Sequence, residues 1–435
     1  MVQVRELSKI APDDLARVMR RAEQDIDSLL PTAVEVTGRV RAEGDAAVVH
    51  YTRKFDAPEF TQEMIRVTPD QFEAARQSLS EDVRKAVLQA HANIERFHAE
   101  QMPEPMWFME VMPGVMAGEK VTPITSVGLY VPRGKGAFPS VMLMLAVPAV
   151  VAGVERVVVV TPPGPDGRVD AASLYAAEVC GVTEVYAVGG MQAVGALAYG
   201  TETIPRVAKI VGPASSYVSA AKRVLYGVVD VGLPAGPSES IILADEYADP
   251  RIAALDLLVE AEHGPDSAAL LVTHSRKVAD EAARLLPELI ARLPQWRREF
   301  VETVLGGYGG ILITASLEES IQFVNDYAPE HLEILTQEPF ATLNRIRNAG
   351  EILLGPHTPI PISNYCLGLN AILPTGAFAR SFSSVSVQDF LKRSGVGYLS
   401  AEGYAALSEP TATLADYEGF PAHALAIRQR AEWWG

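Results

Sequence analysis

The sequence VGLYVP at residues 127–132 is followed, after helix-length segments, by RVVVVTPP at 156–163 and EVYAVGG at 184–190. The same kind of short apolar run continues along the chain, as AKIVGP at 208–213, SIILAD at 240–245, ALLVTH at 269–274, GGILIT at 309–314 and EILLGP at 351–356. Apolar strands that end in Gly or Pro and alternate with helices are typical of βαβ units, whose parallel sheet is covered on both faces. The predicted fold class is therefore α/β.

Helices are predicted on both sides of this strand-rich region. The opening 120 residues are predicted to be helical, because apolar side chains recur at three- and four-residue intervals, as in 83–97. His91 and His98 of this helix are expected to be solvated. The last 50 residues return to helix, through VSVQDFLKRSG at 385–395 and AHALAIRQRAEWW at 422–434. Parallel sheets bind ligands at the carboxyl ends of their strands, so functional residues are expected in the strand-to-helix loops.

The bulk properties exclude several classes of protein. A chain of 435 residues is long enough for two or more domains, and its net charge of -17 disfavours nucleic acid and anionic membranes as partners. The longest apolar stretch, 141–154, is too short to span a bilayer and predicts a buried helix. The charged N-terminus does not resemble a signal peptide, and Cys180 and Cys366 form no paired motif. A cytoplasmic location is expected.

The stretch RIAALDLLVEAEHGPDS at 251–267 predicts a helix that ends near Gly264 and Pro265. Glu260 and His263 are three residues apart at its end, so their side chains project from one face of the helix. Two such groups can ligate one metal ion, although a solvated ion pair explains the spacing equally well.

Two further motifs combine a carboxylate with an imidazole. In NDYAPEHLEIL, the pair Glu330 and His331 leads into a strand, where the two groups could act as acid and base partners. One of them could accept the proton of an alcohol, and the other could activate a water. In EGFPAHALAIRQR, Glu418 and His423 flank a turn at Pro421. Taken alone, each pair could also be incidental.

Together with their neighbours, these motifs resemble histidinol dehydrogenases. The matching segments run in the family's order and spacing, from about residue 35 to the end: GLYVP at 128–132, AFPSVMLM at 137–144, VAGV at 151–154, GGMQAVGALAYGT at 189–201, YVSAAK at 217–222, PAGPSE at 234–239, AEHGPDS at 261–267, NDYAPEHL at 325–332, LPTG at 373–376 and EGFPAH at 418–423. The resemblance implies oxidation of L-histidinol to L-histidine through histidinaldehyde, with zinc and two NAD per turnover. The absence of a GxGxxG fingerprint agrees with this family.

The resemblance also implies a domain organisation. Residues 1–25 would form an N-terminal helical extension, and 26–129 with 238–385 a first Rossmann-like domain that carries the catalytic and metal residues. Residues 130–237 would form a second Rossmann-like domain for the cofactor, and 386–435 a helical dimerisation segment. The protein would be a homodimer, with Glu418 and His423 reaching the site from the partner subunit.

By position, the resemblance gives each motif a role. His331 would be the base of the alcohol step, and Glu330 would activate water in the aldehyde step. Zinc would be bound by Glu260, His263, Asn364 and His423. The cofactor would contact Tyr130, Gln192 and Ser215, and the substrate would contact Ser238, Glu260, His263, His331, Asn364, Glu418 and His423.

Five positions depart from the family's usual residues. Glu260 and Asn364 stand where Gln and Asp usually bind zinc, which leaves the formal ligand charge unchanged. Ala371 replaces a histidine that contacts substrate, and such a loss costs about 1–3 kcal/mol. Ser215 stands where an Asn meets the cofactor, and Arg133 is added to a glycine loop, where it could meet an anion or remain solvated.

Three functions remain open at this point. The first is oxidation of L-histidinol, and the second is oxidation of another polar alcohol by a paralogue, as the family's sulfopropanediol dehydrogenases do. The changed contacts favour altered substrate specificity, while the intact Glu330 and His331 pair favours unchanged chemistry. The third is a catalytically silent relative that binds a small ligand, which loss of that pair would have favoured.

Overall fold

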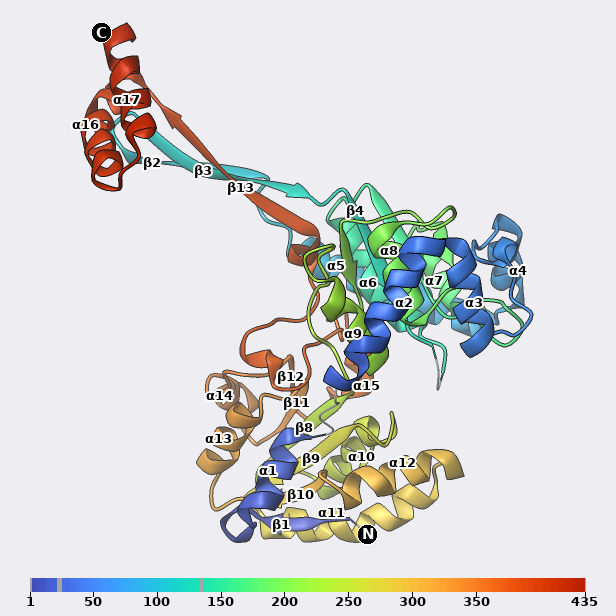
Figure 1. Ribbon diagram of the computed structural model, residues 1–435. Helices are drawn as coiled ribbons and strands as arrows, with labels where there is room; N and C mark the ends of the chain where they lie inside the picture. Colours follow the sequence, from blue (N-terminus) through green and yellow to red (C-terminus); the bar gives the residue numbers. More distant parts are fainter. Residues whose placement is uncertain (1, 22–25, 134–135, 435) are drawn as a thin grey trace. The chain divides into compact units, whose positions relative to one another are not determined.

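The computed structural model describes residues 2–21, 26–133 and 136–434, and the chain falls into two compact units. The first unit comprises Met1–Gln101 and Thr125–Phe390, and the second comprises Met102–Ile124 and Leu391–Gly435. The first unit contains two parallel sheets, and the second contains one antiparallel sheet (Figure 1). The prediction of an α/β fold is confirmed.

The larger parallel sheet has six strands in the order β1-β10-β9-β8-β11-β12. Its strands are β1 (Val4–Glu6), β8 (Glu239–Ala244), β9 (Ala268–Thr273), β10 (Gly310–Ile313), β11 (His331–Leu335) and β12 (Glu351–Leu354). One face packs against α10 (Pro250–Ala261), α11 (Arg276–Ala291) and α12 (Gln295–Gly306). The other packs against α1 (Pro12–Arg20) and α13 (Leu317–Tyr327). Cover on both faces explains why β8 and β9 are buried throughout.

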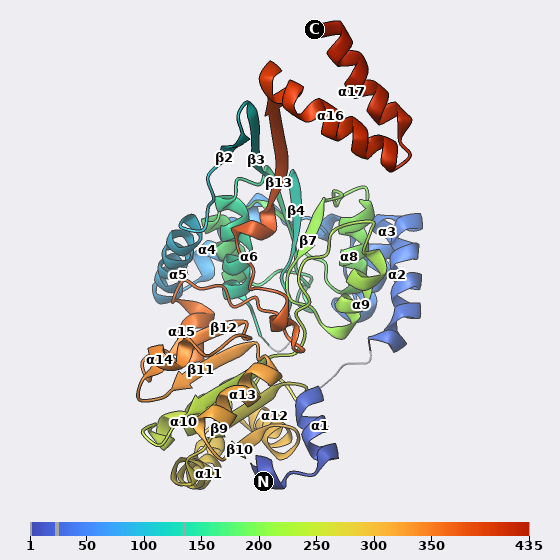
Figure 2. The same cartoon turned by 90° about the vertical axis from the view of Figure 1, so that its left-hand side faces the viewer.

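The smaller parallel sheet has four strands in the order β6-β5-β4-β7. They are β4 (Ser126–Tyr130), β5 (Arg156–Val160), β6 (Glu184–Tyr186) and β7 (Lys209–Val211). Figure 2 shows α2 (Leu30–Glu43), α3 (Asp45–Phe55), α8 (Gly190–Tyr199) and α9 (Ser216–Leu225) together on one side of this sheet. The other helices of this region are α4 (Pro69–Ser78), α5 (Glu81–Ala99), α6 (Pro139–Val151) and α7 (Ala171–Val179). The predicted buried helix at 141–154 is confirmed by α6, which is mostly buried.

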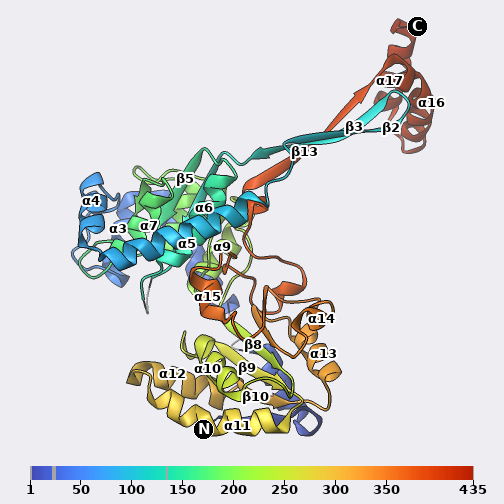
Figure 3. The same ribbon diagram turned by 180° about the vertical axis from the view of Figure 1, so that it is seen from behind.

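The second unit is built from three antiparallel strands and two helices (Figure 3). The strands lie in the order β13 (Leu391–Leu399), β3 (Val115–Pro123) and β2 (Met106–Met112), followed in sequence by α16 (Ala401–Tyr417) and α17 (Pro421–Trp434). Two short helices of the first unit, α14 (Pro339–Leu343) and α15 (Ile360–Tyr365), complete the α-helices. Among the described helices, none is long and apolar enough to cross a membrane.

Two predictions about these elements are wrong. The opening region is helical only as far as Ala99, since β2 and β3 follow, and VSVQDFLKRSG is not a helix because most of it lies in a short 3-10 turn and in β13. All nine residues of β13 pair with β3, so backbone pairing outweighs the local pattern. The helices α16 and α17 confirm the rest of the C-terminal prediction.

The structure also groups the elements differently from the predicted domain boundaries. Helices between residues 30 and 99, expected in the domain of 238–385, pack instead on the four-stranded sheet, because their apolar faces join its core. The expected extension 1–25 supplies β1, an edge strand of the six-stranded sheet. The segment expected at 386–435 is divided after Phe390, and Leu391–Gly435, which contains a strand and two helices, shares its unit with Met102–Ile124.

Candidate active site

The helix α10 brings Glu260 and His263 to one edge of the six-stranded sheet. It begins with Pro250 after Asp249, whose carboxylate accepts a hydrogen bond from the Arg251 N–H at 2.9 Å. It ends at Ala261, so Glu260 lies in its last turn with no exposed surface, and His263 follows directly. The predicted placement of this pair at a helix end is confirmed.

Glu330 and His331 lie at the same edge. His331 is the first residue of β11, and its register partners on the two neighbouring strands are Ser240 of β8 and Glu351 of β12. This edge holds the amino ends of the strands, so the expectation that functional residues follow the carboxyl ends is wrong for this sheet. The reason is that α10 runs back along the sheet and ends where β9 begins.

The imidazole of His331 is surrounded by three carboxylates. Its Nε2 lies 4.0 Å from Glu260 Oε1 and 3.8 Å from Glu330 Oε1, while its Nδ1 lies 2.6 Å from Glu351 Oε1. The Ser363 hydroxyl donates to the other Glu351 oxygen at 2.6 Å. These side chains are all buried, so the contacts operate away from water.

Glu351 and Ser363 were not among the predicted site residues. Glu351 precedes the apolar run ILL at 352–354, and a carboxylate at the start of a buried strand is a signal that could have found it. Ser363 carries no such signal, because only the packing of α15 brings it to Glu351. A third contact was also missed, in which the Glu239 N–H donates to Glu330 Oε2 at 2.7 Å.

The pKa values of the two carboxyl groups that face His331 Nε2, those of Glu260 and Glu330, shift in opposite directions. Burial works to raise the pKa of Glu260, but the charges of His263 and His331 outweigh it and lower the pKa to about 2. Burial raises the pKa of Glu330 well above its ordinary range. For His331, burial works to lower the pKa, but Glu330, Glu260 and Glu351 together raise it to about 10. Such divergent carboxyl groups suit acid and base roles.

The same cluster offers donors for a metal ion. His263 Nδ1 lies 2.6 Å from Glu260 Oε2, and the Asn364 side chain lies beside the Glu260 carboxylate. Asn364 Oδ1 and both Glu260 oxygens are buried and accept no well-aligned hydrogen bond from the described residues. Orphaned buried oxygens next to an imidazole fit zinc. Within 2–21, 26–133 and 136–434, no three His, Cys, Asp or Glu side chains are grouped so that they could hold a metal ion.

The predicted cofactor residues gather at the carboxyl end of the four-stranded sheet, where such residues were expected. Tyr130 ends β4, and its hydroxyl accepts a hydrogen bond from the Gly190 N–H at 3.1 Å. Gln192 is buried in the first turn of α8, and its Nε2 finds no partner among the described residues. Ser215 is the N-cap residue of α9 and is exposed. Helix N-termini of this kind suit an anionic cofactor.

The remaining predicted residues lie in different surroundings. Ser238 is half-buried directly before β8, while Glu418 and His423 belong to the second unit and are exposed in this chain. Arg133 is exposed and lowers the pKa of Asp56, although burial of Asp56 dominates and raises that pKa to about 6. The expectation that His98 is solvated is wrong, because His98 is fully buried and its Nδ1 lies 2.8 Å from the Ile94 carbonyl oxygen.

Comparisons with known proteins give a consistent result. The family model described as histidinol dehydrogenase matches residues 19–431. The chain is 57% identical to a histidinol dehydrogenase of Synechocystis sp., with 99% of both chains covered, and 54% identical to a histidinol dehydrogenase homolog of Cereibacter sphaeroides, with 98% of both covered. The crystal structure of histidinol dehydrogenase from Elizabethkingia anophelis matches with a TM-score of 0.93 at 32% identity, covering 100% of this chain and 98% of that one.

Proposed function

The chain belongs to the histidinol dehydrogenase family, and we propose that it uses NAD and zinc to oxidise a primary alcohol through the aldehyde to the carboxylate. Membership of this family makes it an oxidoreductase that acts on CH–OH groups. The observation that carries the proposal is the buried cluster of Glu260, Glu330 and His331 at one edge of the six-stranded sheet. When bound, zinc supplies a Lewis acid for the substrate oxygen, and NAD accepts the hydride.

In the first oxidation, His331 takes the hydroxyl proton. Its Nδ1 is held by Glu351, so Nε2 is the nitrogen that faces Glu260 and Glu330 and accepts the proton. The pKa of about 10 means that the ring is protonated while three carboxylates surround it. Glu260 would hold the cation, whose charge would offset that of the Glu260 carboxylate and lower the pKa of His331, so that the ring could accept the proton.

In the second oxidation, the aldehyde must gain an oxygen from water. Glu330 lies beside His331, and the Glu239 N–H fixes its Oε2, so Oε1 is the atom that would accept a proton from that water. The raised pKa of Glu330 means that its carboxyl group must first lose the proton it holds. The two steps together convert the alcohol and one water into the carboxylate, with two hydrides passed to two NAD and three protons released. Glu330 and His331 thus serve successive steps in one buried place.

L-Histidinol is the default substrate, and another polar alcohol such as a sulfopropanediol is the second candidate. The observation that favours the second is Ala371, which lies half-buried and has no side-chain group that could meet an imidazole. The two candidates are separated by a substrate panel scored by NADH formation. Turnover of L-histidinol far above that of 2,3-dihydroxypropane-1-sulfonate supports the default, and negligible turnover of L-histidinol excludes it.

We also propose a homodimer in which Glu418 and His423 complete the site of the partner subunit. Its support is the apolar surface of the second unit, where β2 exposes Met106, Trp107, Phe108, Met109, Val111 and Met112. The helices of the same unit expose Leu414, Tyr417, Phe420, Leu425 and Trp433. Side chains of this size are exposed together mainly where another protein surface covers them. A cytoplasmic location is proposed with it, supported by two cysteines that form no disulfide.

A further inference from the structure

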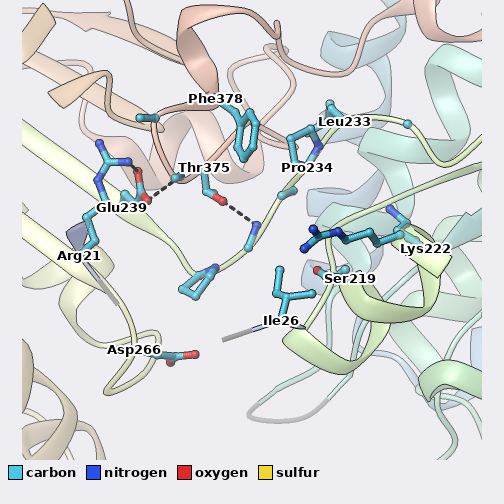
Figure 4. Close-up of a pocket in the computed structure, with 18 of the residues that line it drawn as sticks. Arg21, Ile26, Ser219, Lys222, Leu233, Pro234, Glu239, Asp266, Thr375 and Phe378 are labelled. Atoms are coloured by element: carbon cyan, nitrogen blue, oxygen red, sulfur yellow. Dashed lines mark hydrogen bonds and ion pairs between the residues drawn. The ribbon is translucent and has the colours of Figure 1, made fainter. Parts of the chain in front are cut away.

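A cavity of about 770 Å³ lies in the first unit, where its wall includes Pro237 and Glu239 on either side of Ser238 (Figure 4). Its walls come from α9, from the connector at 231–237, from the loop at 375–378 and from the end of α1. None of the predicted catalytic, metal, substrate or cofactor residues lines it. Its volume is in the range of small-molecule sites.

The cavity and the His331 cluster lie on opposite faces of the six-stranded sheet. Ser240 is the register partner of His331, so the two side chains point to the same face. Glu239 is the next residue along β8 and points to the other face, where it lines the cavity and pairs with Arg21 at 3.3 Å. An occupant of this cavity would therefore not contact His331.

Lys222 gives the cavity a buried positive charge. Its side chain is only 6% exposed, and Nζ donates to the Gly212 carbonyl oxygen at 2.7 Å. In the described part of the chain this is its one hydrogen bond, and it has no ion pair. Burial lowers the pKa of Lys222 to about 8, with Asp230 and Lys209 acting more weakly in opposite directions. An ammonium with spare donors and no counter-ion favours an anion beside it.

Most of the other charged residues of the wall are paired or exposed, and Arg20 is exposed. Arg21 is paired with Glu239, and Arg223 is paired with Asp27 at 2.6 Å. Asp266, the second acidic residue of the wall, is exposed and lies across the cavity from Lys222 in Figure 4. Among the described residues of the wall, Lys222 is therefore the buried cation that has no carboxylate partner.

Apolar side chains form the part of the wall that faces this charge. Phe378 is 47% exposed and lies with Leu233 and Pro234 along one side of the cavity, while Ser219 lies beside Lys222 (Figure 4). Ser219 precedes Lys222 by three residues on α9, so both side chains share a helix face. The combination of a charged corner and an apolar wall suits a ligand with the same two parts.

We propose that this cavity is a second ligand site that binds a small organic anion. The phosphate or carboxylate group of the ligand is held by Lys222 and Ser219, and its apolar body packs against Phe378, Leu233 and Pro234. None of these five residues is assigned to the dehydrogenase site, and occupancy of the cavity does not depend on the proposed reaction.

Calorimetric titration of the full-length protein with phenyl phosphate tests this proposal, because the probe carries both parts of the ligand. Inorganic phosphate and benzyl alcohol, which carry one part each, are expected to bind more weakly. Lys222→Met is expected to weaken phenyl phosphate about tenfold, as loss of a charge-assisted hydrogen bond does. Phe378→Ala is expected to weaken it roughly threefold and to leave inorganic phosphate unchanged. Lys85→Met, which removes an exposed lysine of α5, is the matched control and changes nothing.

Two results would overturn the proposal. One is phenyl phosphate binding with equal affinity to the wild type, Lys222→Met and Phe378→Ala. The other is displacement of phenyl phosphate by NAD, which would assign the cavity to the cofactor. Phe378→Ala keeps the test decisive if Lys222→Met fails to fold, because Phe378 lies at the exposed side of the cavity. No turnover is measured, so failure of the proposed reaction leaves these outcomes unaffected.

Discussion

Glu351 holds His331 by its Nδ1 atom and is held in turn by the Ser363 hydroxyl. A carboxylate in this position fixes the tautomer and the orientation of an imidazole, as in other base-assisted sites. It lies 20 residues from His331 in sequence, and only the parallel register of β11 and β12 brings the two together. Glu351 is therefore a positioning residue for the proposed base.

We expect Glu351→Gln to lower kcat on the order of 10- to 100-fold with little change in KM, because the base loses its orientation. Glu351 raises the pKa of His331, and the base must be deprotonated to act, so loss of Glu351 also shifts the rising, acid-side limb of the kcat profile to lower pH. Steady-state rates between pH 6 and 10 measure both effects. Ser363→Ala removes only the donor to Glu351 and is expected to have a smaller effect. A wild-type pH profile in Glu351→Gln would contradict this role.

The proposed zinc ligands can be tested by measuring zinc affinity, without an activity assay. We expect His263→Ala to weaken zinc binding at least about tenfold, because the imidazole beside Glu260 is lost. Competition with a fluorescent chelator measures the affinity. Glu262→Ala is the matched control, since its carboxylate is part of the same helix end but 41% exposed. Equal zinc affinity in the two variants would argue against this site.

The sequence predicted part of this site and missed part of it for a physical reason. Glu260 and His263 share a helix turn, and Glu330 and His331 are neighbours, so local spacing was enough to pair them. Glu351 and Ser363 depend on strand register and on the packing of α15, which local spacing does not contain. The prediction that His98 is solvated was wrong for the same reason. Its buried partner is Asn370, which is 272 residues away in sequence, with 3.3 Å between Asn370 Nδ2 and His98 Nε2.

The helix α10 and the strand β11 contact each other through two buried acidic side chains. Glu333 of β11 and Asp256 of α10 lie in hydrogen-bonding contact, and no donor from another described residue reaches either oxygen of Glu333. Burial first and Asp256 second raise the pKa of Glu333 far above its ordinary 4.5. One of the two groups must therefore carry a proton in the folded protein.

This pair predicts a pH-dependent stability. The folded state binds a proton that the unfolded chain releases above about pH 4.5, so the stabilisation is complete below that pH and is lost as pH rises. The free energy of unfolding is expected to fall by at most about 1.4 kcal/mol per pH unit. We expect Glu333→Gln to reduce this pH dependence, because the amide imitates the protonated acid. Thermal unfolding between pH 5 and 9 measures it. Glu338→Gln alters an exposed carboxylate and is the control. A wild-type pH dependence in Glu333→Gln would contradict the account.

The sequence predicted the strands well where helices cover both faces of their sheet, and poorly where a strand is exposed. Continuous apolar runs such as ESIILA and AALLVT became the central strands β8 and β9. The strand β13, by contrast, is mostly exposed and contains two glycines, so its identity comes from pairing with β3. A local helical pattern cannot reveal a partner strand whose paired residues lie 268 to 284 positions earlier in the chain.

For the whole molecule, the proposed homodimer predicts complementation between two inactive variants. We expect His331→Asn and His423→Asn each to be inactive, while a mixed dimer keeps one intact site if His423 acts across the interface. Refolding the two together should restore about a quarter of wild-type activity, since half of randomly formed dimers are mixed. Light scattering on each preparation checks that dimers form. No recovery from dimeric mixtures would place His423 in its own subunit or outside the site.

The central claim is a zinc-dependent oxidation in two stages at one site, and the stoichiometry of turnover tests it most directly. Zinc-loaded protein is incubated with limiting L-histidinol and excess NAD, and NADH and L-histidine are measured at completion. The same measurement is made with each alcohol of the substrate panel. The account predicts two NADH for each alcohol consumed, the carboxylate as product, and loss of both when zinc is removed. One NADH with accumulation of aldehyde, or turnover that persists without zinc, would contradict it.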